Sequence, residues 1–253
     1  MQQDADDEPA SALADRIRST AKKLKSAGII RNRKSLPDID GDEVPRLTSD
    51  LWTWIRFDEI AEIVSGVTKG RKLDGKKTSP FPYLRVANVQ AGFLDLNKMK
   101  EIEIPVEELP KCRLEPGDLL LTEGGDWDKL GRSAIWESQI ENCIHQNHVF
   151  RARMIDDSVR PEWIRLFTNS PAGREYFQSK AKKTTNLASI NMTQLRTCPA
   201  PLPPTAQRDR ILDAVDKLMT SCDDLEAKLT QQQADADRLT EAMVTAILNG
   251  AAA

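Results

Sequence analysis

The sequence predicts an α+β protein in which a mixed domain of helices and strands precedes a long coiled-coil helix. Three observations support this prediction. Apolar residues follow a heptad pattern from Ile211 to Leu248. Short β-branched and aromatic segments bounded by Gly and Pro lie between residues 51 and 198, together with two helical segments. A proline-rich stretch at residues 199–204 separates these two parts of the chain.

The C-terminal apolar stripe steps by four and then three residues and is interrupted only at Gln232. One helix of an ordinary bundle is the alternative, but a period sustained over about five heptads favours a long coiled coil. At about 1.5 Å per residue the stripe is roughly 57 Å long, so a partner in this or another chain must cover it. Thr205 suits the start of the helix and Asn249-Gly250 its end. The stripe consists of Ile211, Val215, Leu218, Cys222, Leu225, Leu229, Ala236, Leu239, Met243 and Ala246.

The N-terminal part contains a short basic helix. Apolar residues at helical spacing predict a helix from Ser11 to Ala27, which Gly28 ends. Eight Lys and Arg residues and no acidic residue lie between Arg16 and Lys34. Because the heptad helix is acidic, the short helix is suited to lie beside it. The expected organisation is a disordered tail (1–10), a short helical segment (11–34), a linker (35–50), a globular domain (51–198), a Pro-rich connector (199–204) and the coiled-coil helix (205–250).

Within the globular domain, alternation and turn residues predict the individual elements. Strands are expected at Trp52–Ile55, Tyr83–Val89, Asp118–Thr122, Ser133–Trp136 and Ile144–Ala152. Helices that begin with proline are expected at Pro161–Asn169 and Pro171–Ala181. A helical turn or strand is expected at Phe57–Val64, a long polar loop at Gly66–Pro82 and a turn at Gly124–Asp126.

Charge is unevenly distributed along a chain whose net charge is −3. Residues 51–100 carry nine Lys/Arg against five Asp/Glu, and residues 151–200 carry nine against four. Residues 101–150 carry four against eleven, and residues 201–253 carry five against nine. Such segregation suits one surface for a polyanion and another for protein, although solvated faces of varying charge explain it equally well.

Targeting and redox signals place the chain in the cytoplasm. The sequence has no run of eighteen apolar residues, which predicts no membrane span. Its first ten residues are acidic and polar and do not resemble a signal peptide. The four cysteines stand singly, without disulfide or zinc-pair spacing, as suits a reducing compartment.

A near match to a phosphate-binding loop lies at Gly70–Lys76. Lys77 follows where Ser or Thr is needed to hold magnesium, and Pro80 and Pro82 exclude the required helix. We therefore interpret this segment as a basic loop. Its candidate phosphate contacts are Lys69, Arg71, Lys72, Lys76 and Lys77.

Cys143, His145 and His148 suggest a metal site, but strand geometry separates His148 from the other two and no cysteine pair completes the set. We expect no bound metal. The amides of Gln146 and Asn147 suit hydrogen bonds to base edges, and a structural polar network is the equally plain alternative.

The segment from Lys180 to Asn191 combines three lysines with short hydrogen-bonding side chains, a mixture that suits phosphate contacts and is equally compatible with a solvated loop. No catalytic constellation emerges. The sequence has no nucleophile elbow and no glycine-rich cofactor fingerprint. Glu226-Ala-Lys228 is similar to part of a nuclease motif. It lies on the heptad helix, however, where such pairs are usually surface charges. We therefore expect no catalytic residues and no cofactor.

Several stretches taken together resemble the specificity (S) subunits of type I restriction–modification enzymes. The similarity covers roughly residues 11–250, and any single stretch is weak. The matching stretches are Trp52–Ala61, Tyr83–Gln90, Gly117–Gly131, His145–Phe150, Thr184–Asn191 and Pro201–Pro204 leading into the coiled coil.

This resemblance implies that residues 51–198 form a DNA target recognition domain. In that family each such domain reads one half of a split DNA site and the helices set the spacing. Partners implied are double-stranded DNA, adenine methyltransferase (M) subunits and motor–nuclease (R) subunits, in a system of phage defence. A coiled-coil adaptor that binds only protein remains the alternative. The candidate DNA-contacting residues are Lys69, Arg71, Lys72, Lys76, Lys77, Arg85, Asn88, Gln90, Trp127, Lys129, Arg132, Gln146, Asn147, Lys180, Lys182, Lys183, Thr184 and Asn186.

The chain departs from the family pattern in having one recognition domain where a usual S subunit has two. The segment from Ala12 to Arg33 resembles the helix that enters the second domain of such a subunit. The chain is therefore expected to be a half-size subunit or half of a split one. We expect it to form a homodimer or to pair with another half S subunit.

Overall fold

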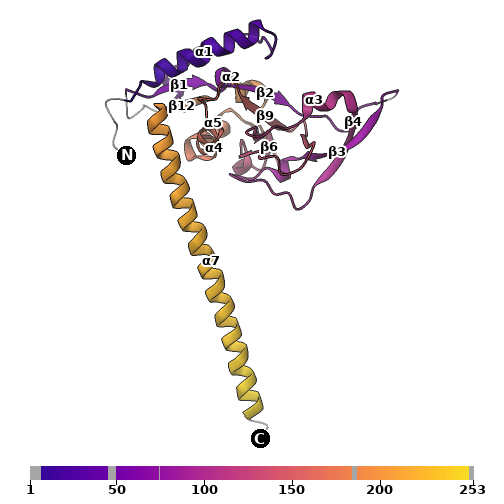
Figure 1. Cartoon of the computed structure of the whole chain (residues 1–253), viewed down its shortest axis with the longest axis vertical. Coiled ribbons are helices and arrows are strands. Elements are labelled where there is room, and N and C mark those ends of the chain that lie inside the picture. The colour runs from indigo at the N-terminus through magenta and orange to yellow at the C-terminus, as the bar shows by residue number, and fades with distance from the viewer. Residues whose placement is uncertain (1–6, 45–49, 74, 184–186, 251–253) are drawn as a thin grey trace. The chain divides into compact units, whose positions relative to one another are not determined.

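The computed structural model describes residues 7–44, 50–73, 75–183 and 187–250, and it divides into two units. The globular unit runs to Thr205 and the C-terminal unit begins at Ala206. The expected tail at residues 1–10 falls mainly outside the described residues. The combination of several small sheets with helices confirms the α+β class (Figure 1).

A four-stranded antiparallel sheet forms the centre of the globular unit. Its order is β2-β9-β5-β7. All four residues of the middle strand β5 are buried, as expected for a strand covered on both faces. The bounds are β2 (Ala61–Ser65), β5 (Leu119–Thr122), β7 (Ser133–Ile135) and β9 (Val149–Met154).

A second sheet extends from the first as a hairpin of β3 (Thr78–Leu84) and β4 (Lys100–Pro105), with β8 (Ile144–His145) on the other side of β3 (Figure 1). β8 pairs only with Tyr83 and Leu84. One edge of β3 is therefore open at Pro80 and Pro82, where residues without an N–H are tolerated.

This hairpin corrects two sequence expectations. The polar loop expected at Gly66–Pro82 ends where β3 begins at Thr78, and the strand expected at Tyr83–Val89 ends at Leu84 and continues as a 3₁₀ turn. β4 was not predicted, because it is stabilised by pairing with β3 and its local sequence does not indicate that pairing. The strand expected at Ile144–Ala152 is also interrupted, since residues 146–148 form a turn between β8 and β9.

Two further sheets are small. β1 (Thr53–Arg56) pairs antiparallel with β12 (Pro199–Leu202). The Pro-rich connector is therefore extended, as expected, but part of it is also a buried edge strand. β6 (Gly124–Gly125), β11 (Ala188–Ser189) and β10 (Lys182–Lys183) form the other sheet, so the expected turn at Gly124–Asp126 is in part a strand.

The predicted helices are largely confirmed. α4 (Pro161–Asn169) matches its predicted bounds. α5 (Pro171–Lys180) ends one residue earlier than predicted, and α1 (Ala10–Ser26) begins and ends one residue earlier. α1 packs its apolar face in the globular unit against α2 and β1. The short elements are α2 (Phe57–Ile60), α3 (Leu109–Cys112), α6 (Met192–Arg196) and 3₁₀ turns at Gly41–Glu43, Val86–Asn88, Val106–Glu108 and Trp127–Lys129.

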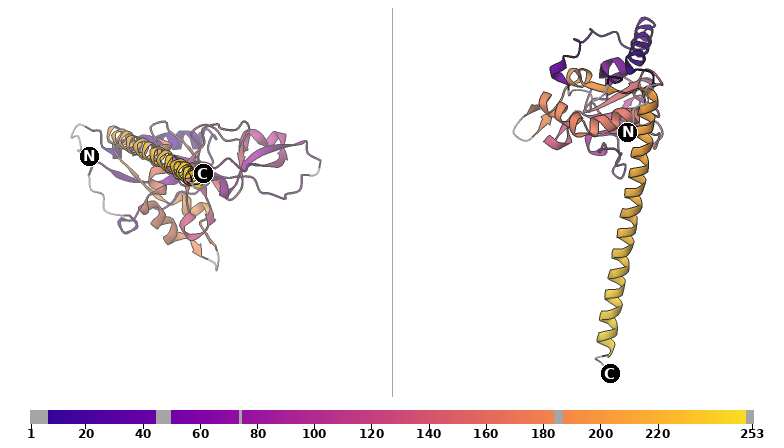
Figure 2. Two further views of the ribbon diagram at one scale, coloured as in Figure 1. Left: turned by 90° about the horizontal axis from the view of Figure 1, so that it is seen from below. Right: turned by 90° about the vertical axis from the view of Figure 1, so that its left-hand side faces the viewer.

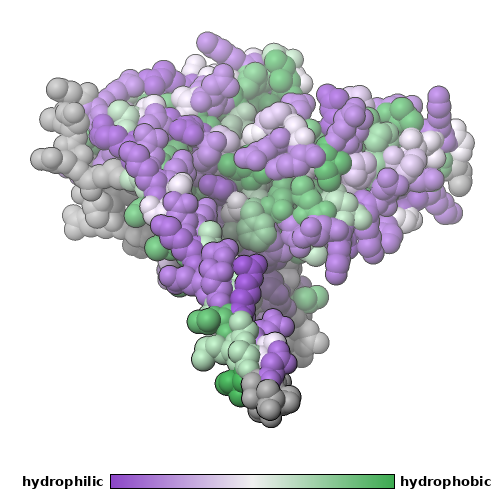
Figure 3. Space-filling view, turned by 60° about the horizontal axis from the view of Figure 1, so that its bottom comes forward, coloured by the Kyte–Doolittle hydropathy of each residue, from purple (hydrophilic) through white to green (hydrophobic). Residues whose placement is uncertain are grey.

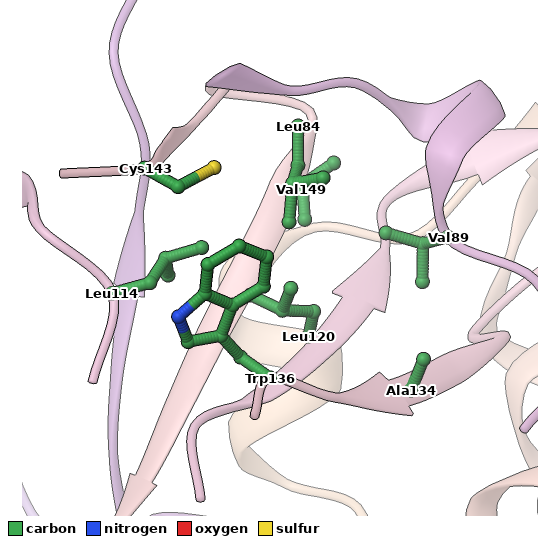
Figure 4. Close-up of a cluster of buried hydrophobic side chains, with 8 residues drawn as sticks. All are labelled: Leu84, Val89, Leu114, Leu120, Ala134, Trp136, Cys143 and Val149. Atoms are coloured by element: carbon green, nitrogen blue, oxygen red, sulfur yellow. The ribbon is translucent and has the colours of Figure 1, made fainter. Parts of the chain in front are cut away.

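The main core lies between the central sheet and the β3–β8 region (Figure 4). Trp136 is 1% exposed and lies among aliphatic side chains from both sheets. Burial of each large apolar side chain contributes about 1.5–3 kcal/mol. The cluster consists of Leu84, Val89, Leu114, Leu120, Ala134, Trp136, Cys143 and Val149.

The buried Arg56 fastens part of the expected linker to the globular unit. Its guanidinium group donates to the carbonyl oxygens of Pro37 and Asp38 at 3.2 and 2.7 Å and to the carboxylate of Glu43 at 2.8 and 3.1 Å. It also donates to Thr197 O at 2.7 Å. Within residues 35–50 the described part that includes these contacts is thus held in place, while residues 45–49 lie outside the described residues.

The C-terminal unit is one uninterrupted helix, α7 (Thr205–Gly250), as the heptad pattern predicts (Figure 2). The leucines of the stripe are exposed: 66% at Leu218, 58% at Leu225, 65% at Leu229 and 62% at Leu239. Figure 3 shows apolar side chains gathered along the visible end of this helix. An exposed stripe of this kind is typical of an interface.

Candidate DNA interface

One end of the central sheet gathers most of the polar turns of the globular unit. Because the four strands are antiparallel, β2 and β5 end at this edge, at Ser65 and Thr122, while β7 and β9 begin there, at Ser133 and Val149. The segments that follow or precede these residues must therefore meet in space. We call this edge the recognition end.

The turn before β9 presents two amide side chains at the recognition end. The backbone of Gln146 donates to Leu84 O at 2.9 Å and that of Asn147 to Val67 O at 3.0 Å. Ser65 Oγ donates to Asn147 O at 2.9 Å. The backbone of the turn is thus fixed, and the side-chain amide of Gln146 has no hydrogen-bond partner in the described part of the chain. An unpartnered, half-exposed amide is suited to bind a base edge.

The two histidines beside this turn have different roles. His145 is buried, its Nδ1 lies 2.7 Å from Val149 O, and burial lowers its pKa to about 4. It is therefore neutral at pH 7. His148 is exposed and its Nδ1 lies 2.6 Å from Glu123 Oε2. Within the polar run 145–148, His145 therefore points into the core, and the next three residues form a turn at the surface.

The cysteine beside these histidines is buried, which raises the pKa of Cys143 to about 12. A protonated thiol is a poor metal ligand. Among the residues that the structure describes, no group of three or more His, Cys, Asp or Glu side chains is placed to hold a metal ion.

The turn between β5 and β7 carries an exposed aromatic residue. β6 pairs with β11 so closely that a Cβ at Gly124 would lie 2.7 Å from Ala188 O, which explains the glycine. Trp127 follows and is 40% exposed. Lys183 Nζ lies 4.9 Å from the centroid of its ring, within cation–π range. This sheet therefore brings together two candidates that are far apart in the sequence.

The remaining lysines near this turn are exposed or weakly engaged. Lys129 pairs with Asp126, and Lys180 Nζ lies 6.0 Å from the Tyr176 ring centroid. Lys182 is exposed on β10. Thr184 and Asn186 lie outside the described residues.

The side chains of Gln90 and Arg132 are joined by a hydrogen bond at the recognition end. Arg132 Nη1 donates to Gln90 Oε1 at 2.7 Å, and Arg132 O accepts from Thr122 N at 3.0 Å. The contact joins residues that are 42 positions apart. The sequence gives no indication of this contact, because only the fold brings the two side chains together.

Arg85 and Asn88 are instead engaged within the globular unit. Asn88 is 3% exposed, its Oδ1 accepts from Arg85 N at 3.0 Å and its Nδ2 donates to Asp95 O at 2.8 Å. Arg85 Nη2 donates to Lys98 O at 2.6 Å. These side chains shape the loop after β3, and the amide of Asn88 is not available to DNA in this conformation.

The basic loop after β2 lies at the far end of the β3–β4 hairpin. Arg71 and Lys76 contact Glu108 at 2.5 and 3.4 Å, and the hydrogen bond from Arg71 lowers the pKa of that carboxyl group. Glu108 closely follows β4, so these contacts hold the loop beside the end of that strand. The other lysines of the loop, which have no ion pair with a described residue, are Lys69, Lys72 and Lys77.

The sequence belongs to the family of the type I restriction modification DNA specificity domain, whose family model matches residues 49–233. That span includes every strand of the globular unit, every turn at the recognition end and the first part of α7, whereas α1 lies before it. The family implies recognition of DNA sequence, and the sequence resemblance is thereby confirmed.

Curated relatives agree with the family match. The chain is 28% identical over 260 residues to the type I restriction enzyme EcoEI specificity subunit of Escherichia coli, covering 98% of this chain and 42% of that protein. It is 28% identical over 171 residues to the EcoKI specificity subunit of Escherichia coli K12, covering 67% of this chain and 37% of that protein. The chain thus spans about two fifths of the length of these relatives.

The fold also resembles a solved structure described as addressing complex assembly and conformational transition of the type I R-M system. The TM-score is 0.52 at 18% identity, with 91% of this chain and 54% of that chain covered. This likeness supports the fold. Among the described residues, no helix is long and apolar enough to cross a membrane.

Proposed function

We propose that the chain acts in DNA sequence specificity and that its globular unit reads one half of a bipartite DNA site. It directs adenine methylation and DNA cleavage by partner methyltransferase and motor–nuclease subunits. The observation that carries the proposal is the recognition end, where the unpartnered amide of Gln146 lies on a rigid turn. The family match supports the same reading.

The side chains divide into base contacts and phosphate contacts. Amide groups pair well with adenine in the major groove, so we assign base reading to Gln146 and Asn147. Lysines position a protein on the duplex by contacting phosphates and carry no sequence information. We assign this role to Lys182 and Lys183 and to the lysines of the basic loop that form no ion pair with a described residue.

We further propose that the chain itself performs no catalysis. Its sequence contains no cofactor fingerprint or nucleophile motif, and the proposed partners supply the chemistry. Purified chain that methylates or cuts DNA without any partner subunit would contradict this assignment.

Self-pairing follows from α7. Its apolar stripe is exposed over most of its length and needs a partner helix. We propose that two copies pair antiparallel through Ile211–Leu248, so that one recognition domain lies at each end. Because site symmetry mirrors protein symmetry, the DNA target is then an interrupted palindrome.

Selection from a random duplex library tests DNA recognition by the full chain. We expect enrichment of one sequence pattern and an affinity that falls steeply with salt. A coiled-coil adaptor that binds only protein is the competing function, suggested by the same exposed stripe. It predicts no enrichment and no salt-dependent duplex affinity, together with stable binding to a methyltransferase subunit.

Direction of methylation is tested separately in the host. Methylated adenines are mapped in the genome with and without the chain, while the methyltransferase subunits are kept constant. We expect loss of methylation at one interrupted palindromic pattern. An unchanged methylation map would contradict the directing role.

A further inference from the structure

We infer that Phe93 is a specificity-determining side chain that inserts at a base step of the bound duplex. The inference rests on the proposed function, because it requires DNA at the recognition end. Phe93 is 62% exposed, although burying a phenylalanine is worth about 1.5–3 kcal/mol. A single exposed apolar residue is ordinary by itself, so the argument depends on how this one is held and what surrounds it.

The turn that carries Phe93 is fixed by two backbone–backbone hydrogen bonds and by one from a side chain. Gln90 N donates to Phe93 O at 3.0 Å, and Gly92 N donates to Ser133 O at 2.9 Å. Arg165 Nη1 donates to Gly92 O at 3.0 Å. Gly92 has φ +95°, a conformation that favours glycine. Since Ser133 is the first residue of β7, these contacts hold the turn at the recognition end.

The residues on either side of the turn are anchored in the core. Val89 is fully buried in the Trp136 cluster, where Figure 4 shows it, and Leu94 packs against the same cluster. Val89 and Leu94 also form an isolated antiparallel bridge. Within this turn, Phe93 is therefore the apolar residue that points outward. The backbone that carries it is held in place by its buried neighbours.

The surroundings of the turn are cationic. Arg165 binds Gly92 O, and Arg132 binds the side chain of Gln90. The pKa of Asp126 is lowered mainly by the hydrogen bond from Lys129, and the charge of Arg132 adds to this effect, which places Arg132 near the turn that carries Trp127. An apolar side chain flanked by guanidinium groups suits duplex DNA, since the cations attract phosphates while the ring enters between bases.

The two exposed aromatic residues of the recognition end differ in one respect. The ring of Trp127 is covered by Lys183, whereas Phe93 has no ring or cation contact with any described residue. Its free face is available for stacking. Insertion of such a side chain unstacks a step, so sequences with weakly stacked steps are favoured at that position.

The test uses the full chain and the duplex that wild-type protein enriches from a random library. Variants are Phe93→Ala and Phe93→Leu, with Ile29→Ala as the matched control, since Ile29 is 67% exposed and follows α1. Base–aromatic stacking predicts about five- to hundredfold weaker binding for Phe93→Ala. Phe93→Leu should retain most of the affinity, because leucine also serves as a wedge. Ile29→Ala should bind as wild type.

A second measurement separates insertion from simple contact. 2-Aminopurine is placed at each position of the enriched duplex in turn, and its fluorescence reports unstacking. Wild-type protein should raise the signal at one step, and Phe93→Ala should abolish the rise while keeping wild-type thermal unfolding.

Wild-type affinity in Phe93→Ala, with no position of raised fluorescence for either protein, would overturn the inference and leave the proposed function intact. Loss of methyltransferase binding with unchanged DNA affinity would show a protein contact instead and also overturn it. Failure of wild-type protein to enrich any duplex would remove the proposed function and this inference together.

Discussion

Gln146 shows how a rigid turn exposes a single chemical group. Its backbone is fixed by Leu84, while its side-chain amide is left without a described partner. Replacing it by alanine should therefore relax sequence preference without unfolding the protein. A good bidentate base contact is worth about 1–3 kcal/mol of discrimination.

The measurement for Gln146→Ala is the affinity ratio between the enriched duplex and a scrambled duplex of the same length. Gln231→Ala is the control, because the amide of Gln231 is exposed on α7 and bonds to Asp235 at 2.9 Å. An unchanged ratio in Gln146→Ala would contradict the base contact.

His145 makes stability depend on pH. Its pKa is lowered to about 4 in the folded protein, chiefly by burial, from an ordinary value of about 6.5. Between these values the unfolded chain binds more protons, so stability falls as the pH drops from about 6.5 towards 4 and is fully present above that window. The full loss corresponds to roughly 3 kcal/mol.

Urea unfolding of wild type and His145→Gln between pH 5 and 7 tests this linkage. We expect His145→Gln to flatten the slope of stability against pH. Equal slopes for wild type and His145→Gln would exclude the buried histidine as the source.

At the scale of elements, the lysine-bearing segments should act additively and without sequence preference. Neutralising Lys182, Lys183, Lys69 or Lys72 should each flatten the plot of log affinity against log salt by about one unit. Lys23, which is exposed on α1, is the matched control and should leave the slope unchanged. Binding titrations over a range of salt concentrations measure the effect. A lysine variant that changes sequence preference at constant slope would contradict its assignment to phosphate.

Local signals predicted some elements well and tertiary contacts determined the others. α4 and α7 could be predicted because a proline start and a heptad interrupted only at Gln232 can be recognised in consecutive residues. β4 and the β6–β11–β10 sheet could not, since their hydrogen bonds come from segments distant in sequence.

The candidate site shows the same division. Residue type identified the amides and lysines that meet at the recognition end. It did not show which candidate side chains would form hydrogen bonds or ion pairs within the protein. Asn88 became a buried link between Arg85 and Asp95, and Arg71 was paired with Glu108. Phe93 was missed because an apolar residue in a loop carries no functional signal until its exposure is known.

For the whole molecule, pairing should depend on the middle of α7. Leu225→Asp with Leu229→Asp places two charges on the apolar stripe, where both leucines are more than half exposed in the single chain. We expect light scattering to report monomers for this variant, or loss of the complex with methyltransferase subunits, because buried unpaired charges oppose association.

Ala227→Asp is the control for pairing, since this residue lies off the stripe on the same helix. Both variants should keep the thermal unfolding of the globular unit. A stable monomer of the unmodified chain at concentrations well above those in the cell would contradict self-pairing and favour a different half-subunit as partner.

The exposed stripe of α7 also bears on how much of the protein a cell can hold. A copy made without a partner carries its row of leucines into water, where chaperones and proteases bind such surfaces. Burial in a complex removes that exposure by mass action. The quantity of DNA-reading protein should therefore follow the supply of its partner, so that unassembled copies are cleared before they occupy DNA sites.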